Sequence, residues 1–501
     1  MRSSGILCPL FSLASRFGIG CISREAYDFI DFLEMSGQSY WQILPIGPTG
    51  YGNSPYQPVS AFAGNPYFIS PEALIEKGLL SHDDCNLFFG ADEEKVDYGA
   101  LYENRLTLLR IAYHNFVQAN GPSDSVFVSF CESEKEWLDD YAIFCAIKEE
   151  NNGASWQDWP TEYKEKKATA LNAFQKEHTE SIGFYRFLQY EFTLEWNKLR
   201  EYAASKKVRI IGDIPFYVAM DSSDVWAHPE VFQMSADLEP LVVAGCAPDA
   251  FSATGQLWGN PIYDWDRLKK ARYAWWVRRM ARSYELYDVI RIDHFHGFTE
   301  YYAVPYGQDT AEKGTSHPGP GLDFFRILEE ELGPISTEEG VRIIAEDLGT
   351  VTKENQVLLA KTGIPGMKIL QYAFTSWDSL YLPYKHEHNC VVYTGTHDNM
   401  TSRNWLDCIN DGERSYLRRY LNSMNSDYGG LVWDLIREAY RSVGDLCIIP
   451  IQDYLVKGYE ARINTPGAPD GNWEWRLKPN FLSNELASSI RLLAETYGRI
   501  N

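Results

Sequence analysis

The chain has 501 residues, 45% of them hydrophobic and 14% aromatic, which is enough apolar material for one large core or a few ordinary ones. Its formal net charge of −23 argues against nucleic acid or an anionic membrane as a partner, because both require clustered Lys and Arg. The 9 cysteines are dispersed without a CxxC pair, which indicates neither a zinc knuckle nor a disulfide framework and favours a reducing compartment.

The first stretch, residues 1–20, contains one short apolar run. Pro9 and several polar residues interrupt this run before it reaches the length of a signal-peptide core or of a membrane span. We therefore expect a cytoplasmic protein, or a protein of an organelle stroma if a transit peptide has already been removed.

Eight short apolar runs follow one another along the chain, and each ends in polar residues or in Gly and Pro. In chain order they are GILCPLFSL (5–13), YWQILPIGP (40–48), VRIIGDIPF (208–216), VIRIDHF (289–295), VRIIAEDLG (341–349), MKILQYAF (367–374), VVYTGTHDN (391–399) and LCIIPIQDYL (446–455). Helical patterns separate most of them, and a last one closes the chain: 23–37, 271–288, 322–333, 353–363, 431–444 and 482–499. Buried strands that alternate with helices predict an α/β fold, a (β/α)₈ TIM barrel, over residues 1–501 as a single catalytic unit.

Two intervals between the predicted strands are longer than a crossover needs. Helix-like patterns at 102–119, 134–150 and 182–206 lie between the second and third strands, and the last of these is the expected barrel helix. Residues 70–178 are therefore predicted to form a helical insertion at the carboxyl-terminal face of the barrel. Residues 221–265, an irregular stretch rich in Gly, Pro and aromatics, are predicted to form a binding loop or lid after the third strand.

Polar side chains follow most of these strands, and the active sites of such barrels form at the carboxyl ends of the strands. In chain order these side chains are Asp213, Arg291, Asp293, His294, Glu346, Asp347, His397, Asp398 and Asp453. Carboxylates that follow hydrophobic strands should be partly desolvated and should repel one another, which raises at least one pKa. Such a pair is suited to splitting a glycosidic bond, because one carboxylate attacks the sugar while the other donates a proton.

The segment VIRIDHFHGF (289–298) carries the first half of this pair. Arg291 and Asp293 share one strand face, so Asp293 is the expected nucleophile and Arg291 is expected to lower its pKa. Glu346, with apolar neighbours, is the expected acid/base, and Asp398 the group that clamps sugar hydroxyls. His294 and His397 are expected to donate further hydrogen bonds.

Two other interpretations of these residues remain open. Taken alone, the Arg–Asp pair and its His neighbour could be a buried ion pair and a core histidine that satisfy each other. A metal site would use the same residue types, but no two histidines have a ligand spacing, and Arg291 would lie beside the ion. We therefore expect no metal.

Several motifs across nearly the whole chain resemble those of the amylomaltases, the 4-α-glucanotransferases or disproportionating enzymes related to the α-amylases. They are LPIGPTGYGNSPYQPVSAFAGNPYFI, IGDIPFYVAMDSSDVWAHPEVF, FSATGQLWGNPIYDW, RIDHFHG, IIAEDLGT, GIPGMKILQYAF, TGTHDNMT and EARINTPGAPDGNWEWR. The resemblance implies that Asp293 forms the glycosyl-enzyme, that Glu346 is the acid/base and that Asp398 stabilises the transition state.

The same resemblance implies a set of sugar-binding residues. Tyr56 would be a platform at the donor subsite, where Asp213, Arg291, His294 and His397 hold the same sugar. Gln256, Trp258 and Asn464 would line neighbouring subsites. Trp258 has an alternative interpretation, because an aromatic ring in LWGNP could simply fill a tight turn.

Two departures from the family pattern lie near these residues. His296 stands where the family usually has Arg, and Ala250 stands where an aromatic residue commonly precedes Phe251. Both changes leave the three carboxylates in place, but they put acceptor binding, product size and the exclusion of water in question.

The expected reaction is a retaining double displacement on α-1,4-glucans and maltooligosaccharides, and it requires no cofactor. An α-glucan hydrolase with the same three carboxylates is the nearest alternative, and a non-catalytic glucan-binding protein is a second. We expect a monomer or a weak homo-oligomer.

Overall fold

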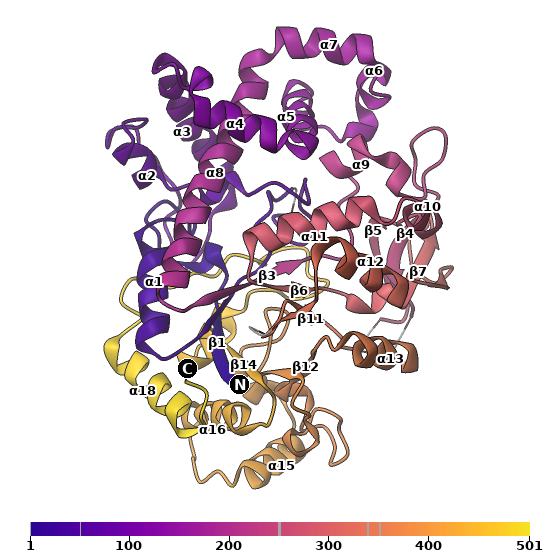
Figure 1. The fold of residues 1–501 in the computed structure, drawn as a ribbon. Helices are drawn as coiled ribbons and strands as arrows, with labels where there is room; N and C mark the ends of the chain where they lie inside the picture. The colour runs from indigo at the N-terminus through magenta and orange to yellow at the C-terminus, as the bar shows by residue number, and fades with distance from the viewer. Residues whose placement is uncertain (1, 51, 249–251, 338–339, 350–351, 501) are drawn as a thin grey trace.

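The computed structural model describes residues 2–50, 52–248, 252–337, 340–349 and 352–500. One sheet contains eight strands: β1 (Ser3–Leu7), β2 (Tyr40–Gln42), β3 (Arg209–Ile214), β6 (Val289–Ile292), β11 (Ile343–Ala345), β12 (Gly366–Ile369), β13 (Cys390–Tyr393) and β14 (Leu446–Pro450). All of their pairings are parallel, and β1 pairs with both β2 and β14. The N–H of Ala345 donates to the carbonyl oxygen of Pro365 at 2.9 Å and joins the two ends of the sheet. The strands follow one another around a nearly closed barrel, which confirms the predicted (β/α)₈ fold (Figure 1).

Helices occupy most of the crossovers between strands, as α1 (Arg24–Met35), α8 (Thr179–Ser205), α11 (Ala274–Leu286), α12 (Leu322–Leu332), α13 (Lys353–Thr362) and α16 (Tyr428–Arg441). A further helix, α18 (Asn484–Thr496), follows the last strand. Helix α16 buries Leu431, Leu435 and Ala439, which recur every four residues and so form one apolar face. The connection from β12 to β13 contains only the 3₁₀ turns η7 (Leu370–Tyr372) and η8 (Pro383–Lys385). The turns suit this stretch, because residues 375–389 have no helical period of apolar residues.

The interior of the barrel is filled by alternate residues of the strands. One cluster of buried side chains contains Leu7, Ile211, Val289, Ile344, Val391 and Ile448. Ile290 and Ile292 belong instead to the larger cluster that contains the helices. Side chains alternate along a strand, so the residue two positions after an interior residue also points into the barrel. It lies one layer closer to the carboxyl ends of the strands.

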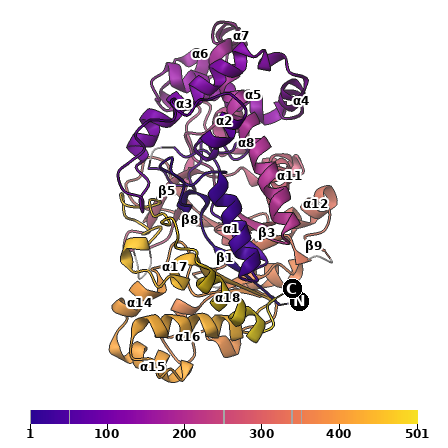
Figure 2. The same cartoon turned by 90° about the vertical axis from the view of Figure 1, so that its left-hand side faces the viewer.

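Among the described residues, six α-helices lie between β2 and β3 and precede the crossover helix α8: α2 (Pro71–Glu76), α3 (Tyr98–Gln118), α4 (Ser125–Ser133), α5 (Lys135–Glu150), α6 (Thr161–Lys164) and α7 (Ala168–Glu177). Asp97 and Asp124 cap the first turns of α3 and α4 by accepting backbone N–H groups. Figure 2 shows α3 to α7 together at one end of the molecule, with α14 (Ser402–Cys408), α15 (Asp411–Leu421) and α16 at the other. The hydrophobic core runs without interruption from the barrel into these helices.

Residues 221–265 are not irregular, so that part of the expectation is wrong. They contain α9 (Ser223–Ala227), β4 (Val242–Cys246) and β5 (Gln256–Pro261), and α10 (Trp265–Lys270) follows. β4 and β5 join β7 (Glu300–Pro305) and β8 (Thr315–Pro318) in an antiparallel sheet of order β5-β4-β7-β8. β4 pairs with β5 inside this stretch, but its other partner, β7, lies beyond β6, and such a long-range pairing leaves no local signal in short strands. Ala250 lies outside the described residues.

The remaining elements are small. β9 (Ser336–Thr337) and β10 (Gly340–Val341) form an antiparallel pair, and α17 (Ile451–Tyr454) follows β14. A search of the described ranges finds no helix with both the length and the apolar character needed to cross a membrane.

Candidate active site

The ends of β3 and β6 bring three charged groups together. Asp213 and Arg291 are direct partners in the strand register, and the Arg291 guanidinium donates from Nη1 to Asp213 Oδ2 at 2.6 Å. Its Nη2 donates to Asp293 Oδ1 at 3.0 Å, and the Tyr56 hydroxyl donates to Asp213 Oδ2 at 2.8 Å. The Arg291 side chain is 2% exposed, so neighbouring side chains fix its position. Asp293 is therefore held in one orientation by a buried network that begins at Tyr56.

Glu346 follows β11, two residues beyond the interior residue Ile344. Its Oε2 accepts the backbone N–H of His294 at 2.8 Å, and its Oε1 accepts the N–H of Leu348 at 3.0 Å. His294 has a φ of 49°, a left-handed conformation that is costly for a residue with a Cβ. This turn directs the His294 N–H toward the end of β11, so a strained backbone position helps to place Glu346.

Asp398 lies in the loop after β13. The Oδ2 of Asp398 is 3.2 Å from His397 Nε2, and its Oδ1 accepts from Asn464 Nδ2 at 2.6 Å. The Arg462 guanidinium donates to the Asp398 carbonyl oxygen at 3.2 Å. Both oxygens of the carboxylate therefore have side-chain partners, unlike those of Glu346.

Asp453 anchors the loop that carries His397 and Asp398. It is buried in α17, directly after β14. Its carboxylate accepts hydrogen bonds from Thr394 Oγ1 at 2.6 Å, from the Ser402 N–H at 2.7 Å and from Ser402 Oγ at 2.6 Å. Thr394 and Ser402 stand on either side of the two residues, so one carboxylate holds both ends of the loop. Its place after an apolar strand was the sequence signal for this residue.

A cavity of about 430 Å³ lies at the carboxyl ends of these strands. The predicted residues that line it are Tyr56, Trp258, Arg291, Asp293, His294, Glu346 and Asp398. Asp213, His397 and Asn464 do not line it but contact residues that do. Lining residues that the sequence analysis did not single out include Gln57, Tyr217, Asn260 and Tyr372, which stand within or beside its quoted motifs.

Aromatic rings form part of the wall of this cavity. The Tyr56 ring stacks on His397 with centroids 5.1 Å apart, and the Trp258 ring meets His294 edge to face at 4.9 Å. Trp258 therefore does more than fill its own turn. Gln256 is exposed and accepts from Trp258 Nε1 at 3.2 Å, so it contacts the cavity wall from outside.

The pKa values of Asp293 and Glu346 are both raised. For Asp293, burial outweighs the opposing effect of Arg291, and Asp213 and Asp398 add to the rise. Arg291 lowers this pKa, as expected, but the net shift is upward, because loss of solvent is the larger effect. For Glu346, burial and the nearby Asp293 raise the pKa, which agrees with the expected protonated acid. Arg291 bonds Asp293 directly, so a proton shared by the pair resides preferentially on Glu346.

The pKa of Asp398 is shifted in the opposite direction, downward. Burial opposes its ionisation, but His397 and the hydrogen bond from Asn464 offset this effect and hold its pKa well below the usual range. Burial lowers the pKa of His294 to about 4, with a further contribution from His296, so His294 is neutral near pH 7. Burial also lowers the pKa of His296, which therefore does not replace the charge of an Arg at neutral pH.

The cavity thus combines a fixed carboxylate, a carboxylic acid with a raised pKa and a second, strongly ionised carboxylate. This combination can attack an acetal carbon, protonate its leaving oxygen and stabilise the positive charge between them. No group of three or more His, Cys, Asp or Glu within the described ranges is placed to hold a metal ion.

The sequence matches the family described as 4-alpha-glucanotransferase over residues 8–483. It is 47% identical to the 4-alpha-glucanotransferase of Clostridium butyricum, covering 97% of this chain and 99% of that protein. It is 40% identical to that of Thermus thermophilus, covering 100% of this chain and 99% of that protein. Among solved structures, amylomaltase from Streptococcus agalactiae in complex with acarbose superposes with a TM-score of 0.95, at 37% identity and full coverage of both chains.

Proposed function

The chain belongs to the 4-alpha-glucanotransferase family, and from that premise we propose that Asp293, Glu346 and Asp398 perform its transfer reaction. The substrates are α-1,4-glucans and maltooligosaccharides, which serve as both donor and acceptor. The contact that supports this assignment best is the pair of hydrogen bonds that Arg291 donates, which ties Asp293 to the barrel. Among the described residues, the hydrogen bonds of the Glu346 carboxyl group come from backbone N–H groups alone.

In the first step an oxygen of Asp293 attacks the anomeric carbon of the donor. The bond from this carbon to the leaving oligosaccharide breaks, and Glu346 gives its proton to the departing oxygen. The product is an ester between the sugar and Asp293. Asp398, ionised and fixed by Asn464, stabilises the positive charge on the flattened ring by holding its hydroxyls.

In the second step the 4-hydroxyl of an acceptor sugar attacks the same carbon from the opposite side. Glu346, now a carboxylate, takes the proton of this hydroxyl, and the bond to Asp293 breaks. Two inversions restore the α-configuration. Glu346 supplies the proton itself, because its raised pKa keeps the carboxyl group protonated. The reaction therefore needs no cofactor.

The sugar next to Asp293 contacts Tyr56, which presents its ring, and the polar groups of Arg291 and His294. Asp213 and His397 position these groups. Asp213 accepts hydrogen bonds from Tyr56 and Arg291, and His397 stacks on Tyr56 and lies beside the Asp398 carboxylate. Gln256, Trp258 and Asn464 serve the neighbouring subsites. Their positions at the cavity wall, or against residues of that wall, support these assignments.

Residues 1–501 act as one catalytic barrel with an insertion at 70–178 and a lid at 221–265. Transfer exceeds hydrolysis when the acceptor sugar occupies the cavity and the lid keeps water from the ester. The antiparallel sheet that joins β4 and β5 to β7 supports a fixed position for this lid, and Trp258 of β5 lines the active-site cavity.

The protein works in a reducing compartment, the cytoplasm or an organelle stroma, as a monomer or weak homo-oligomer. The nine cysteines are free throughout the part of the chain that the structure describes, which supports this compartment.

Incubation with maltotriose tests the reaction. We expect a ladder of longer and shorter maltodextrins, read by chromatography of the products. Maltose and glucose without longer species would identify a hydrolase instead, and binding of maltotriose without any products would identify a non-catalytic glucan-binding protein.

A further inference from the structure

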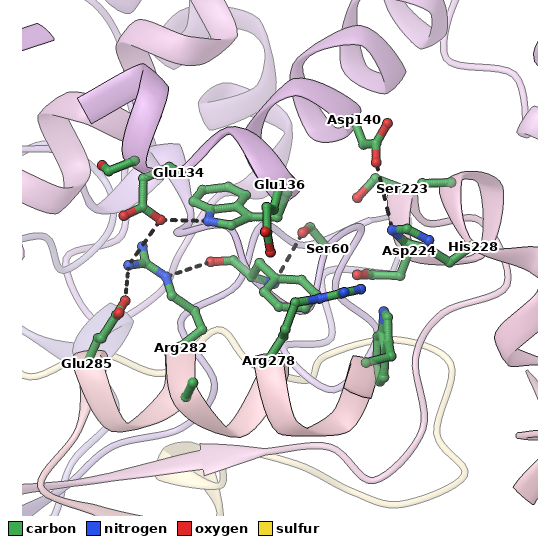
Figure 3. Close-up of a pocket in the computed structure, with 16 residues that line it drawn as sticks. Ser60, Glu134, Glu136, Asp140, Ser223, Asp224, His228, Arg278, Arg282 and Glu285 are labelled. Atoms are coloured by element: carbon green, nitrogen blue, oxygen red, sulfur yellow. Dashed lines mark hydrogen bonds and ion pairs between the residues drawn. The ribbon is translucent and has the colours of Figure 1, made fainter. Parts of the chain in front are cut away.

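A second cavity, of about 180 Å³, lies between the helical insertion and the barrel. Residues of α5 form one wall and residues of α11 form the other, while α9 and the segment 60–62 close it (Figure 3). It shares no lining residue with the active-site cavity. The two cavities can therefore be altered separately.

Three aromatic rings contribute to its lining. Phe62 and Trp137 lie nearly parallel, with centroids 6.5 Å apart and an interplanar angle of 14°. Trp275 meets Phe62 edge to face at 5.9 Å. Phe62 and Trp275 are buried, and the Arg282 guanidinium lies 5.3 Å from the centroid of the Trp137 ring. Trp137 is partly exposed, and a flat apolar ring of this kind packs against the apolar face of a pyranose ring.

Two opposite charges at this cavity have no partner. Glu136 extends from α5 and Arg278 from α11 toward the space between the two helices (Figure 3). Both side chains are exposed, and neither makes an ion pair or hydrogen bond with any residue that the structure describes. They offer an acceptor and a donor to one bound molecule.

Two buried donors of the lining also lack an acceptor. Arg282 is 7% exposed; it bonds Phe62 and Glu285, but its Nη2 has no partner among the described residues. The indole Nε1 of Trp275 is likewise buried and without a described partner. Unsatisfied buried donors are costly, so a small shift of Arg282 or Trp275 that presents its free N–H to an oxygen-rich ligand in the cavity would be favourable.

The charge and size of the cavity restrict its ligand. Five carboxylates line it, from Glu134, Glu136, Asp140, Asp224 and Glu285, against the two guanidinium groups of Arg278 and Arg282. This excess disfavours an anion. Drug-sized ligands fill about 300–1,000 Å³, so 180 Å³ suits a smaller molecule. A sugar hydroxyl both donates and accepts, and so matches carboxylates and guanidinium groups together.

Taking the substrate class from the proposed function, we propose that this cavity is an accessory binding site for one hexopyranose unit of a neutral glucan. The ring packs against Trp137, and its hydroxyls bond Glu136 and Arg278. The site holds a glucan chain at the junction of insertion and barrel, apart from the reacting bond.

Fluorine NMR of protein labelled with 5-fluorotryptophan tests the site directly. The Trp137 resonance is assigned by its loss in Trp137→Phe, and methyl α-D-glucopyranoside, which has no glucan bond to donate, is the probe. We expect a saturable shift of this resonance. The Glu136→Ala, Arg278→Ala double variant should weaken binding about tenfold or more, which corresponds to about 1.4 kcal/mol.

Lys135→Ala is the matched control, because Lys135 is exposed on the same helix but does not line the cavity. It should leave the shift unchanged, and sodium phosphate should not reproduce the shift. Absence of a saturable shift, an equal shift in the double variant, or a shift produced by phosphate alone would overturn the proposal.

Maltotriose turnover separates this proposal from the proposed function. The double variant should retain the wild-type product ladder, with a raised KM only for long glucans. If the wild type made no ladder, the transfer reaction would be refuted while the NMR result would still decide whether the cavity binds sugar.

Discussion

Glu346 and Asp398 stand at the ends of two barrel strands and line one cavity, yet their pKa values move in opposite directions. The partners of Glu346 are two backbone N–H groups, and its charged neighbour Asp293 has the same sign. Asp398 instead has His397 and Asn464 on its two oxygens. Position in the fold brings a carboxylate to the cavity, and the side chains around it decide whether it holds a proton.

Replacing Asp293 should have the largest effect on turnover. Asp293→Ala should lower turnover by about four orders of magnitude or more, because no other group is placed to form the ester. Binding of maltodextrin should persist, as measured by calorimetry, and the melting temperature serves as the control for folding. Unchanged turnover would refute the nucleophile assignment.

Glu346→Gln removes the proton donor and should lower turnover by about 10²- to 10⁴-fold on maltotriose. With α-maltosyl fluoride as donor, the first step needs no protonation, so the burst of fluoride in the first turnover should recover, while later turnovers stay slow because the second step still lacks its base. Asp398→Asn should not recover with this donor, because Asp398 acts on the ring rather than on the leaving group. Equal recovery of both variants would erase the distinction drawn between the two carboxylates.

The pH dependence of kcat/KM gives a third test. Asp293 must be ionised and Glu346 protonated, and both pKa values are raised, so activity should fall on the acid side at a pH above the usual carboxyl range of about 4. On the alkaline side, kcat/KM should fall as the Asp293–Glu346 pair loses the proton that Glu346 holds. An acid limb at or below pH 4 would contradict the raised pKa of Asp293.

Asn464→Ala tests whether the hydrogen bond from Asn464 keeps Asp398 ionised. Loss of this donor raises the pKa of Asp398, so the variant should lose about tenfold in kcat, and more as the pH falls. Asn389→Ala is the matched control, since Asn389 is exposed and donates to Gly363 O. Equal pH profiles for Asn464→Ala and the wild type would show that Asn464 does not set the charge.

The smallest effect is expected at Asp453, which acts on Asp398 through the loop. Asp453→Asn keeps the shape of the side chain but weakens its bonds to Thr394 and Ser402. We expect a loss of a few-fold in kcat and about 1–3 kcal/mol in the free energy of unfolding. The shape of the pH profile should not change, which separates a positioning residue from a titrating one.

The sequence predicted the barrel strands and the polar residues that follow five of them because both signals are local. Alternation along a strand placed Arg291 and Asp293 on one face, and the apolar run before Glu346 predicted its burial. These features require no knowledge of which strands are neighbours, so they could be inferred one segment at a time.

Features that depend on distant segments were not predicted. The sheet of β4 and β7 joins residues about 60 apart, as in the pairing of Val243 with Val304. The pKa of Asp293 was predicted in the wrong direction, because Arg291 is visible beside it in the sequence while the extent of burial is not. The anchoring role of Asp453 likewise appears only when β13 and β14 lie side by side.

The pairing of β1 with β14 has a consequence for biosynthesis. Residues 3–7 leave the ribosome before every other strand of the barrel, but their partner strand spans residues 446–450, so the ring stays open until those residues have been translated. Nascent chains therefore expose an unpaired edge strand until residues 446–450 emerge. A ribosome stalled before that point carries the nucleophile and the acid/base without a closed barrel to align them.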